Sequence, residues 1–347
     1  MKRYGHLFEK VVDPENIKLA ILQASKGKRN HRNVKRVLND IDTYVMRIQT
    51  MLLSYEYQPS HVAEKGIMER GKHRVITSSP FFPDQIIHWA LMLVLQPVFL
   101  KSMYEYNMAT IPRRGTGQGR RVLVKWLKSD PKHTKYCLKM DVHHFYPSID
   151  HGILKQKLKH RFKDERVLKL LFDIIDCYSS GLPLGLYTSQ WLANFYLESL
   201  DHKIKNDWGA TYYMRYMDDL VILGPNKRKL HKLELKITGF LANEKLQTKG
   251  NWQVFHIRDR PIDFLGFRFY RSHLTLRSSI ALRIRRRLKR IKQHTFTTTT
   301  DARAVISYWG WLKHSNSFNF YQKYVKPNCS IKTAKKAIKN ANKRRSS

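Results

Sequence analysis

The sequence predicts an α+β fold. Several long segments carry apolar residues at helical spacing, which favours helices. Two segments, Tyr136–Asp141 and Tyr212–Gly224, carry the aromatic and β-branched residues typical of strands. Hydrophobic residues make up 42% of the 347 residues and aromatic residues 12%, so the chain can bury a core.

The charge of the chain predicts a polyanionic partner. Lys and Arg number 65 against 27 Asp and Glu, which gives a formal net charge of +38. An excess this large favours nucleic acid as the partner first and an anionic membrane surface second. A basic surface that serves solubility alone is the less favoured interpretation.

Secretion, membrane insertion and a cysteine framework are not indicated. The N-terminus lacks an apolar signal core, and the longest apolar run, Trp89–Leu95, is too short to span a bilayer. The three cysteines lie far apart without a C-x-x-C pair, which argues against a zinc site or a disulfide framework. We therefore expect a cytoplasmic protein, from a reducing setting, with no membrane partner.

The first 60 residues are predicted to be mostly helical. Asp13-Pro14-Glu15 is typical of a helix start, and a second helix is expected over about 32–54. Residues 60–80 are predicted to be strands with a turn at Arg70-Gly71. The basic strand 72–76 suits phosphate contact, although an edge strand protected by its cations explains it as well.

A strongly apolar helix, interrupted at Pro97, is expected over 84–104. Residues 111–121 follow as a flexible loop with three glycines and four arginines, before a helix that begins near Val122. Backbone amides and guanidinium groups in such a loop can cradle phosphates. The loop lacks the residue order of a P-loop.

Residues 134–150 are predicted to form a strand, Tyr136–Asp141, that ends on a carboxylate. The aromatic pair Phe145-Tyr146, a turn at Pro147-Ser148 and a helix capped by Asp150 follow. A rigid strand end is a favourable place for a ligand-binding carboxylate. Taken alone, a strand that simply ends in a polar residue is the safer interpretation.

Residues 181–197 are predicted to be a Gly/Pro loop that leads into a helix capped by Thr188 or Ser189. Gly181 and Gly185 would allow close backbone approach to a ligand. The remaining elements are expected in this order: a helix over 227–245, strands over 252–257 and 263–270, and a strongly basic helix over 280–293. The tail from Lys332 is expected to be frayed, or ordered only on a partner.

Two adjacent carboxylates, Asp218 and Asp219, stand at the turn of the 212–224 hairpin. Close carboxylates raise each other's pKa, so a bound cation would explain the pair. Magnesium takes oxygen ligands and keeps positions open for substrate phosphates. Because Asp is also a common turn residue, the hairpin alone leaves the two interpretations balanced. Asp141 on an adjacent strand would complete a cluster of three carboxylates that suits a two-metal phosphoryl-transfer site.

At this point the chain resembles a reverse transcriptase. Tyr216-Met217-Asp218-Asp219 matches the Tyr-x-Asp-Asp box of that family, and Asp141 with Phe145-Tyr146 matches its first palm motif. Phe264-Leu265-Gly266 is similar to the primer grip. Segments 72–76 and 111–115 resemble the fingers motifs, so the resemblance runs from about residue 15 to about 325.

The resemblance implies a right-hand polymerase whose palm is an antiparallel sheet. Its expected parts are a helical N-terminal extension (1–54), fingers (55–130), palm (131–274), helical thumb (275–325) and basic tail (326–347). The implied catalytic residues and metal ligands are Asp141, Asp218 and Asp219, joined by the carbonyl of Val142. They would hold two Mg²⁺ ions, for which Mn²⁺ can substitute. Asp218 should matter more than Asp219.

The nucleotide contacts that the resemblance implies are Lys72, Arg74, Tyr146, Leu184, Gly185, Gln190 and Lys249. Tyr146 matches an aromatic steric gate that excludes a ribose 2′-hydroxyl, whereas Phe145 suits a core position. Leu184 replaces an amide that steadies the nucleotide in other members, which predicts low fidelity. A lysine in the region of Lys249 would protonate the leaving pyrophosphate, and Lys245 competes for this role.

The residues expected to contact nucleic acid are Arg113, Arg114, Arg283, Arg286, Arg287 and Arg290. One departure concerns the second fingers motif, where many bacterial members carry an Arg before the Pro and this chain has Ile111. Arg113 or Arg114 would have to substitute for it.

Within the family, Leu184-Gly185 and Ser189-Gln190 are similar to the bacterial and phage enzymes of diversity-generating retroelements, which implies error-prone cDNA synthesis. Template RNA, primer or cDNA, dNTPs and a small helical accessory protein are the implied partners. A reverse transcriptase of a retron or phage-defence (antiviral) system is the alternative. A non-enzymatic RNA-binding scaffold on the same fold is less favoured, because all three carboxylates are present.

Overall fold

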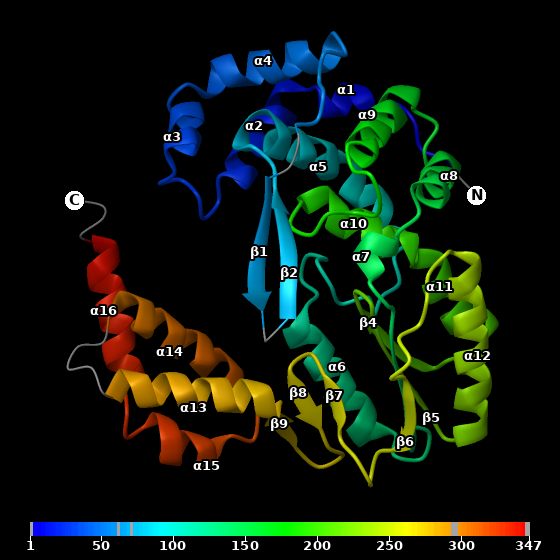
Figure 1. Cartoon of the computed structure of the whole chain (residues 1–347), viewed down its shortest axis with the longest axis vertical. Helices are drawn as coiled ribbons and strands as arrows, with labels where there is room; N and C mark the ends of the chain where they lie inside the picture. The colour runs from blue at the N-terminus through cyan, green and yellow to red at the C-terminus, as the bar shows by residue number, and fades with distance from the viewer. Residues whose placement is uncertain (1–2, 61–62, 70–71, 293–297, 344–347) are drawn as a thin grey trace. The chain divides into compact units, whose positions relative to one another are not determined.

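The computed structural model of the chain describes residues 3–60, 63–69, 72–292 and 298–343 (Figure 1). Two compact units make up the chain. The first contains Met1–Gly115, Lys139–Leu220 and His231–Trp252, and the second contains Thr116–Leu138, Val221–Leu230 and Gln253–Ser347. Because these units do not follow the boundaries expected for fingers, palm and thumb, those subdivisions stay predictions.

The N-terminal helices of the first unit form from local signals. They are α1 (Phe8–Val11), α2 (Pro14–Ala24), α3 (Arg32–Asn39) and α4 (Ile41–Leu53). The predicted start of α2 is confirmed, since the Asp13 side chain accepts a hydrogen bond of 2.9 Å from the amide of Glu15. The single helix expected over 32–54 is wrong. Asp40 has non-helical φ and ψ of −145° and 58°, and it separates α3 from α4.

The predicted strands at 60–80 are confirmed as β1 (Ala63–Glu69) and β2 (Lys72–Ser78). The two strands pair antiparallel, with Ala63 opposite Ser78 at one end and Glu69 opposite Lys72 at the other. The predicted turn at Arg70-Gly71 lies outside the described residues. A π-helical segment, η1 (Phe81–Gln85), then leads into α5 (Ile86–Leu100).

The predicted interruption at Pro97 is wrong, because α5 continues through it to Leu100. Helix α5 packs against α2 and against α10 (Tyr187–Tyr196), and residues such as Leu91 and Leu95 are fully buried. This burial outweighs the one backbone hydrogen bond that a proline removes from a helix.

The expected N-caps of α10 are also wrong. The helix begins at Tyr187 after Leu186, so Thr188 and Ser189 lie buried inside it. The Thr188 hydroxyl lies 3.1 Å from Nδ1 of the buried His88 on α5, a contact that sequence periodicity does not indicate.

The sheet that carries the hairpin has four strands in the order β4-β5-β3-β6. Its strands are β3 (Tyr136–Asp141), β4 (Tyr212–Tyr216), β5 (Asp219–Gly224) and β6 (Gln253–His256). The predicted bounds of Tyr136–Asp141 and of the 212–224 hairpin are confirmed. The division between the two units passes through β3 and β5.

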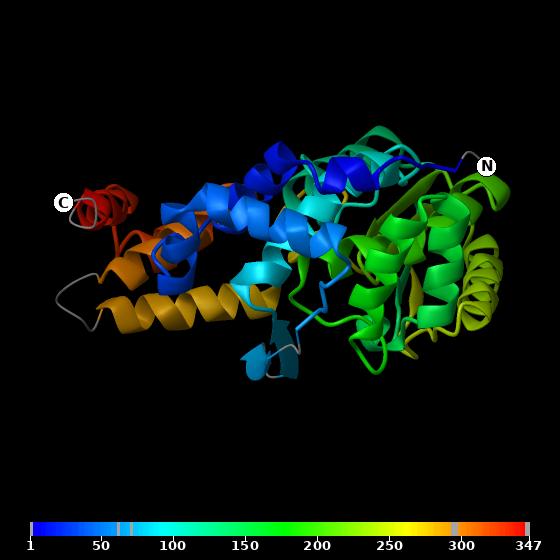
Figure 2. The ribbon, with the colours of Figure 1, turned by 90° about the horizontal axis from the view of Figure 1, so that it is seen from above.

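Short helical segments and three longer helices complete the part of the chain around these strands. They are α7 (Phe145–Ser148), α8 (His151–Arg161), α9 (Glu165–Asp176), α11 (Glu198–His202), η2 (Lys203–Asp207) and α12 (Lys227–Asn243). The predicted N-cap of α8 is confirmed, since Asp150 accepts a hydrogen bond from the amide of Ile153 at 2.9 Å. Helices α8 and α9 lie side by side in both views (Figures 1 and 2).

The second unit contains α6 (Thr116–Ser129), a three-stranded antiparallel sheet and the C-terminal helices. The strands are β7 (Ile262–Phe264), β8 (Phe267–Phe269) and β9 (Leu274–Leu276). Helix α6 begins six residues before the predicted Val122, because Gly117 and Gly119 are helical. The strand expected over 263–270 is broken by the turn at Leu265-Gly266, where Gly266 has φ +84° and an added Cβ would meet the Trp311 ring at 2.7 Å.

The C-terminal helices are α13 (Ser278–Lys292), α14 (Thr299–Leu312), α15 (Phe318–Phe320), η3 (Tyr321–Val325) and α16 (Ile331–Lys343). The basic helix expected at 280–293 is confirmed as α13. The frayed tail is wrong as a prediction, because α16 packs against α14 through the buried Ala334 (Figure 1). In the part of the chain that the structure describes, no helix is long and apolar enough to cross a bilayer.

Candidate active site

Asp141 is the last residue of strand β3, which is anchored in the core by buried side chains. Leu138 and Met140 are buried, and Asp141 is half-buried at the last position of the strand. The backbone around it is fixed on two sides. The carbonyl of Asp141 accepts a hydrogen bond from the amide of Lys249 at 2.8 Å, and the amide of Val142 donates to the carbonyl of Asp218 at 3.1 Å. The strand end is therefore tied to the hairpin turn.

A buried arginine that the sequence analysis missed supports the hairpin turn. Arg215 has no exposed side-chain surface and donates from Nη1 to the carbonyl of Met217 at 3.0 Å. Met217 itself has φ +55°, a left-handed conformation that needs such support. An arginine in the middle of an apolar strand is the sequence signal that points to this role.

The guanidinium of Arg215 is neutralised by Asp201 of α11. Its Nε lies 2.7 Å from Oδ1 of Asp201, and neither side chain is exposed. Two further hydrogen bonds complete the network. Nη1 of Arg215 donates to Oδ1 of Asn194 on α10 at 3.2 Å, and the hydroxyl of Tyr213 donates to Oδ1 of Asp201 at 2.6 Å. Removing one partner would leave an uncompensated buried charge, so this ion pair fixes the turn firmly.

The carboxylate centre consists of Asp141, Asp218 and Asp219. Burial, followed by the charge of Asp141 and a hydrogen bond shared with its carboxyl group, raises the pKa of Asp218 to about 6. Burial raises the pKa of Asp219 to about 7, against the opposing effect of Lys139. The pKa values of both carboxyl groups are therefore displaced toward neutral pH, and a bound cation would oppose this displacement.

Asp219 forms an ion pair with Lys139, while the charges of Asp141 and Asp218 add to the rise of its pKa. Its Oδ1 lies 3.3 Å from Nζ of Lys139, yet this oxygen is buried and accepts no hydrogen bond. Among the described residues, no group of three or more His, Cys, Asp or Glu side chains is arranged to hold a metal ion. The structure thus joins Asp141 to Asp218, and the three-carboxylate metal site stays a prediction.

The aromatic pair after β3 divides as the sequence analysis expected. Phe145 is 3% exposed and belongs to the core, whereas Tyr146 is half-buried. The Tyr146 hydroxyl donates to Sδ of Met217 at 3.5 Å, beside the hairpin turn. Burial and the nearby charge of Asp218 raise the pKa of Tyr146, so its hydroxyl stays neutral. Its role as a steric gate is not tested by these contacts.

The loop at 181–186 needs both of its glycines. Gly185 has φ +120°, and an added Cβ would lie 2.3 Å from the carbonyl oxygen of Thr77. Gly181 has φ +62°, and an added Cβ would meet the backbone of Tyr146 and Pro147 at 2.5 Å. The backbone therefore approaches β2 at one end of the loop and the α7 turn at the other.

Two hydrogen bonds fix the middle of this loop to β2. The amide and the hydroxyl of Thr77 both donate to the carbonyl of Leu184 at 2.8 Å. The side chain of Leu184 remains half-buried, as does that of Gln190 on α10. Lys72 and Arg74 lie on β2 and pair across the hairpin with Glu69 and Ile67, and the structure does not describe their side chains.

Of the two competing lysines, Lys249 is the one beside the carboxylates. Its charge lowers the pKa of Asp218 against the larger effect of burial, and its backbone is bonded to Asp141. Lys245 instead pairs with the N-cap of α8, with its Nζ 2.7 Å from Oδ2 of Asp150. This contact favours Lys249 over Lys245 for a role at the carboxylate centre.

The two arginines of the 111–115 loop differ in their surroundings. Arg114 donates from Nη1 to the carbonyls of Tyr104 at 2.6 Å and Asn107 at 3.4 Å, so it holds its own loop together. Burial lowers the pKa of Arg114 from its usual value. Arg113 is exposed and has a left-handed backbone with φ +64°, so it is the more accessible guanidinium for a nucleic-acid phosphate.

The arginines of α13, in the second unit, also differ. Arg283, Arg286 and Arg290 are exposed, whereas Arg287 is half-buried and its Nη2 donates to Oδ1 of Asp301. All four were predicted to contact nucleic acid, and that role stays a prediction.

Part of the chain is similar in sequence to known proteins. A family model described as reverse transcriptase (RNA-dependent DNA polymerase) matches residues 62–269, more than half of the chain. The retron Ec73 reverse transcriptase of Escherichia coli is 31% identical over 101 residues, which is 25% of this chain and 32% of the relative. The retron Ec86 reverse transcriptase of the same organism is 27% identical over 113 residues, 32% of this chain and 35% of the relative. Each match therefore spans about a third of the relative's own length.

A solved structure is similar at the level of the fold. Telomerase from Candida albicans, solved in complex with the TWJ fragment of telomeric RNA, matches with a TM-score of 0.51 at 11% identity. The match covers 68% of this chain and 51% of that chain. The predicted α+β, right-hand polymerase fold is confirmed by this likeness and by the mixture of helices and antiparallel strands.

Proposed function

Because the chain belongs to the reverse transcriptase (RNA-dependent DNA polymerase) family, we propose that it synthesises DNA on an RNA template from dNTPs. The observation that carries the proposal is the pairing of two partly buried carboxyl groups, Asp141 at the end of β3 and Asp218 in the hairpin turn, where the amide of Val142 donates to the carbonyl of Asp218. Carboxylates held this close serve phosphoryl transfer when they share cations.

Magnesium fits the donor set of the carboxylate centre. The pKa values of Asp218 and Asp219 are raised despite the nearby Lys249 and Lys139, and the buried Oδ1 of Asp219 accepts no hydrogen bond, so the site can take up further positive charge and has an acceptor without a donor. Asp141 and Asp218 would be the main ligands of two Mg²⁺ ions, with Asp219 and the carbonyl of Val142 assisting, and Mn²⁺ could substitute. Bound there, the metal would favour the ionised primer 3′-hydroxyl and neutralise charge on the triphosphate.

The protein's own residues position the reacting groups. Arg215 and Asp201 hold the turn that carries Asp218, and the Tyr146 ring beside that turn would clash with a ribose 2′-hydroxyl and so favour dNTPs. Gly185 would let the loop backbone approach the nucleotide, with Leu184 and Gln190 beside it. Lys249 would donate a proton to the leaving pyrophosphate.

Contacts to phosphates complete the proposal. Lys72 and Arg74 would hold the triphosphate of the incoming nucleotide. Arg113 and the exposed arginines of α13, with Arg114 and Arg287 supporting them, would contact the template and primer.

Primer extension tests the proposal directly. A labelled DNA primer on an RNA template, with dNTPs and Mg²⁺, should be extended by the wild-type protein and about 10³-fold more slowly by Asp218→Asn. Asp207→Asn is the matched control, because Asp207 is exposed and forms a surface ion pair with Lys203 at 3.5 Å. No extension by the wild type, or equal extension by Asp218→Asn, would overturn the proposal.

The biological setting has two candidates. The relatives from retrons Ec73 and Ec86 favour a retron-type enzyme. Leu184, at the loop position where other members carry an amide, favours error-prone synthesis in a diversity-generating retroelement with a small helical accessory protein. Sequencing of extension products separates the two. A retroelement enzyme should misincorporate opposite template adenine, and Leu184→Gln should reduce that error. Faithful copying by the wild type, or no change in Leu184→Gln, would exclude the second candidate.

A further inference from the structure

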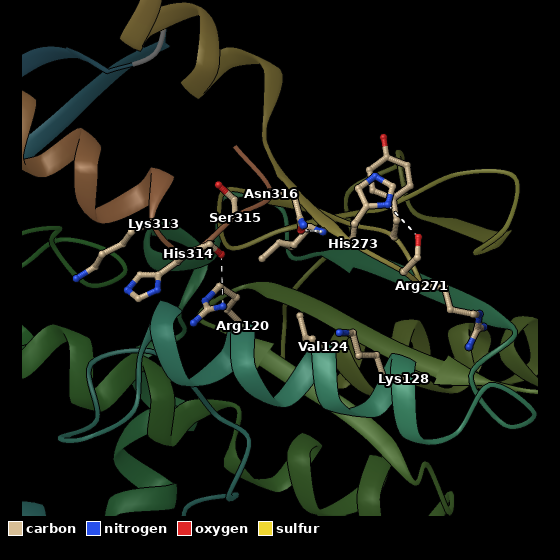
Figure 3. Close-up of a pocket in the computed structure, with 12 residues that line it drawn as sticks. Arg120, Val124, Lys128, Arg271, His273, Lys313, His314, Ser315 and Asn316 are labelled. Carbon is tan, nitrogen blue, oxygen red and sulfur yellow. Dashed lines mark hydrogen bonds between the residues drawn. The ribbon is translucent and has the colours of Figure 1, made fainter. Parts of the chain in front are cut away.

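A cavity of about 290 Å³ lies within the second unit, apart from the residues assigned above. Its wall comes from α6, from the segment between β8 and β9, and from the end of α14 and the segment after it (Figure 3). We call it the cationic pocket, and it is lined by Arg120, Val124, Lys128, Tyr270, Arg271, Ser272, His273, Leu274, Lys313, His314, Ser315 and Asn316.

The wall of the cationic pocket is held by hydrogen bonds within the protein. Arg271 donates to the carbonyls of Leu127 and Thr134 at 3.0 and 2.9 Å, which fixes the β8–β9 segment against α6. The amide of Asn316 donates to the carbonyl of Leu274 at 2.7 Å, and its side-chain Oδ1 accepts from the amide of Leu274 at 2.9 Å. These bonds hold together the segments that form the wall of the cavity.

The lining contains four cationic side chains and two histidines but no carboxylate. The four acids of the second unit each have a basic partner elsewhere. The pairs are Asp130 with His133, Asp259 with His256, Asp263 with Arg277, and Asp301 with Arg287. Among the described residues of this unit, no acid neutralises the pocket.

The charges of the pocket act on one another. Burial, with Arg120, Lys313 and Arg121 nearby, lowers the pKa of His314 below its usual value. Burial and the charge of Arg121 also lower the pKa of Arg120. Nη1 of Arg120 makes a long contact of 3.4 Å to the carbonyl of His314, while its Nε is buried without a partner (Figure 3). An anion in the pocket would relieve this repulsion and supply the missing acceptor.

The pocket also offers an aromatic surface. The rings of Tyr270 and His273 stack with centroids 4.2 Å apart and planes 8° from parallel, and His273 is exposed. Planar side chains beside cations are the combination that binds single-stranded nucleic acid, since phosphates meet the cations and bases stack on the rings.

We propose that the cationic pocket binds single-stranded RNA, with a phosphate against Arg120, Lys128 and Lys313 and a neighbouring base on the exposed His273 ring. The choice of RNA as the source of the phosphate rests on the proposed function. The charge and shape of the pocket are observed independently of that function. Free phosphate has the same chemistry and is distinguished by the experiment.

The experiment measures RNA binding by the full-length protein in EDTA and without nucleotides. Fluorescence anisotropy with a labelled twelve-nucleotide oligo(U) gives the Kd at several salt concentrations. The test variant is Lys128→Gln/Lys313→Gln, and the control is Lys125→Gln. Lys125 is an exposed lysine of the same helix, α6, that does not line the pocket. Thermal melting checks that all three proteins are folded.

The double variant should weaken binding about tenfold at 0.15 M salt and reduce the slope of log K against log salt by about 0.7, the value for one phosphate contact on a single strand, while Lys125→Gln changes the Kd less than twofold. Equal weakening by both variants would overturn the proposal, because it would show a general charge effect. An unchanged Kd would also overturn the proposal. If inorganic phosphate, added in the melting experiment, then raised the melting temperature of the wild type more than that of the double variant, the pocket would bind free phosphate instead of RNA. Because the assay needs no catalysis, its outcome is separate from a failure of primer extension.

Discussion

The carboxylate centre and the cationic pocket are both concentrations of like charge, but they are built differently. The carboxylate centre is half-buried, and its residues are placed by backbone hydrogen bonds around the end of β3 and the hairpin turn and by the buried Arg215–Asp201 pair. The cationic pocket is lined by long side chains such as Lys128 and Lys313, and only its wall is fixed. The first arrangement fixes the positions of individual carboxylate oxygens. The second creates a region of positive electrostatic potential without fixing the position of each cation.

This difference predicts how each region responds to substitution. A reaction that depends on atomic positions should be lost when one carboxylate oxygen becomes an amide. Binding that depends on a field of cations should weaken in steps, each of which is sensitive to salt. The predictions below test this contrast from the largest expected effect to the smallest.

The largest effect should follow substitution within the carboxylate centre. Asp141→Asn and Asp218→Asn should each slow primer extension about 10³-fold, because each removes a principal charge at the reacting centre. Asp219→Asn should slow it about tenfold to 100-fold, because Asp219 is turned toward Lys139. Rates from rapid-quench extension would check the ranking. If Asp219→Asn were the most damaging of the three, Asp219 would have to be a principal ligand.

The next effect concerns selection of the sugar. Tyr146→Ala should raise incorporation of ribonucleotides relative to deoxynucleotides about 100-fold, because the ring that crowds the 2′-hydroxyl is gone. Tyr146→Phe keeps the ring and loses only the contact between the hydroxyl and Met217, so it should keep the wild-type preference. Competition between labelled rNTP and dNTP measures both. Unchanged selectivity in Tyr146→Ala would remove Tyr146 from the nucleotide site.

The Arg215–Asp201 ion pair of the first unit should contribute more to the free energy of unfolding than the Arg287–Asp301 ion pair of the second unit. Asp201→Asn should lower the free energy of unfolding by about 3–5 kcal/mol, because it leaves the fully buried Arg215 unpaired. Arg287→Gln in the second unit should cost only about 1 kcal/mol, since the Arg287 side chain is 30% exposed. Urea unfolding followed by circular dichroism measures both. Similar losses would mean that the two supports are equally buried in solution.

The smallest effect is expected on helix α13. Arg286→Gln should weaken RNA binding about twofold to threefold and reduce the salt slope by about 1, because Arg286 is exposed and would lose one phosphate contact. Arg287→Gln is the comparison, and it should change the salt slope less than Arg286→Gln because the Arg287 guanidinium donates to Asp301. Anisotropy titrations at several salt concentrations distinguish the two. A larger slope change in Arg287→Gln would reverse their roles.

Local signals in the sequence predicted much of the fold. The strand Tyr136–Asp141 and the helix starts after Asp13 and Asp150 were predicted correctly, because alternation and N-capping depend on a few neighbouring residues. Long-range packing explains the errors. Helix α5 survives Pro97 because its faces are buried against other helices, and α16 forms against α14.

The candidate site was predictable in part for the same reason. Asp141, Asp218 and Asp219 stand out as carboxylates in apolar strands, a pattern visible along the chain. The Arg215–Asp201 pair and the cationic pocket join residues far apart in sequence, so no local spacing indicates them. The orientation of Asp219 toward Lys139 likewise depends on which strands are neighbours.

The most direct test of the account is single-turnover primer extension across a range of primer–template concentrations, which yields a maximal rate and a Kd for each protein. We predict that Asp218→Asn lowers the maximal rate about 10³-fold with a Kd within twofold of the wild type. The Lys128→Gln/Lys313→Gln variant should instead raise the Kd about tenfold. A maximal rate for Asp218→Asn equal to that of the wild type would contradict the account.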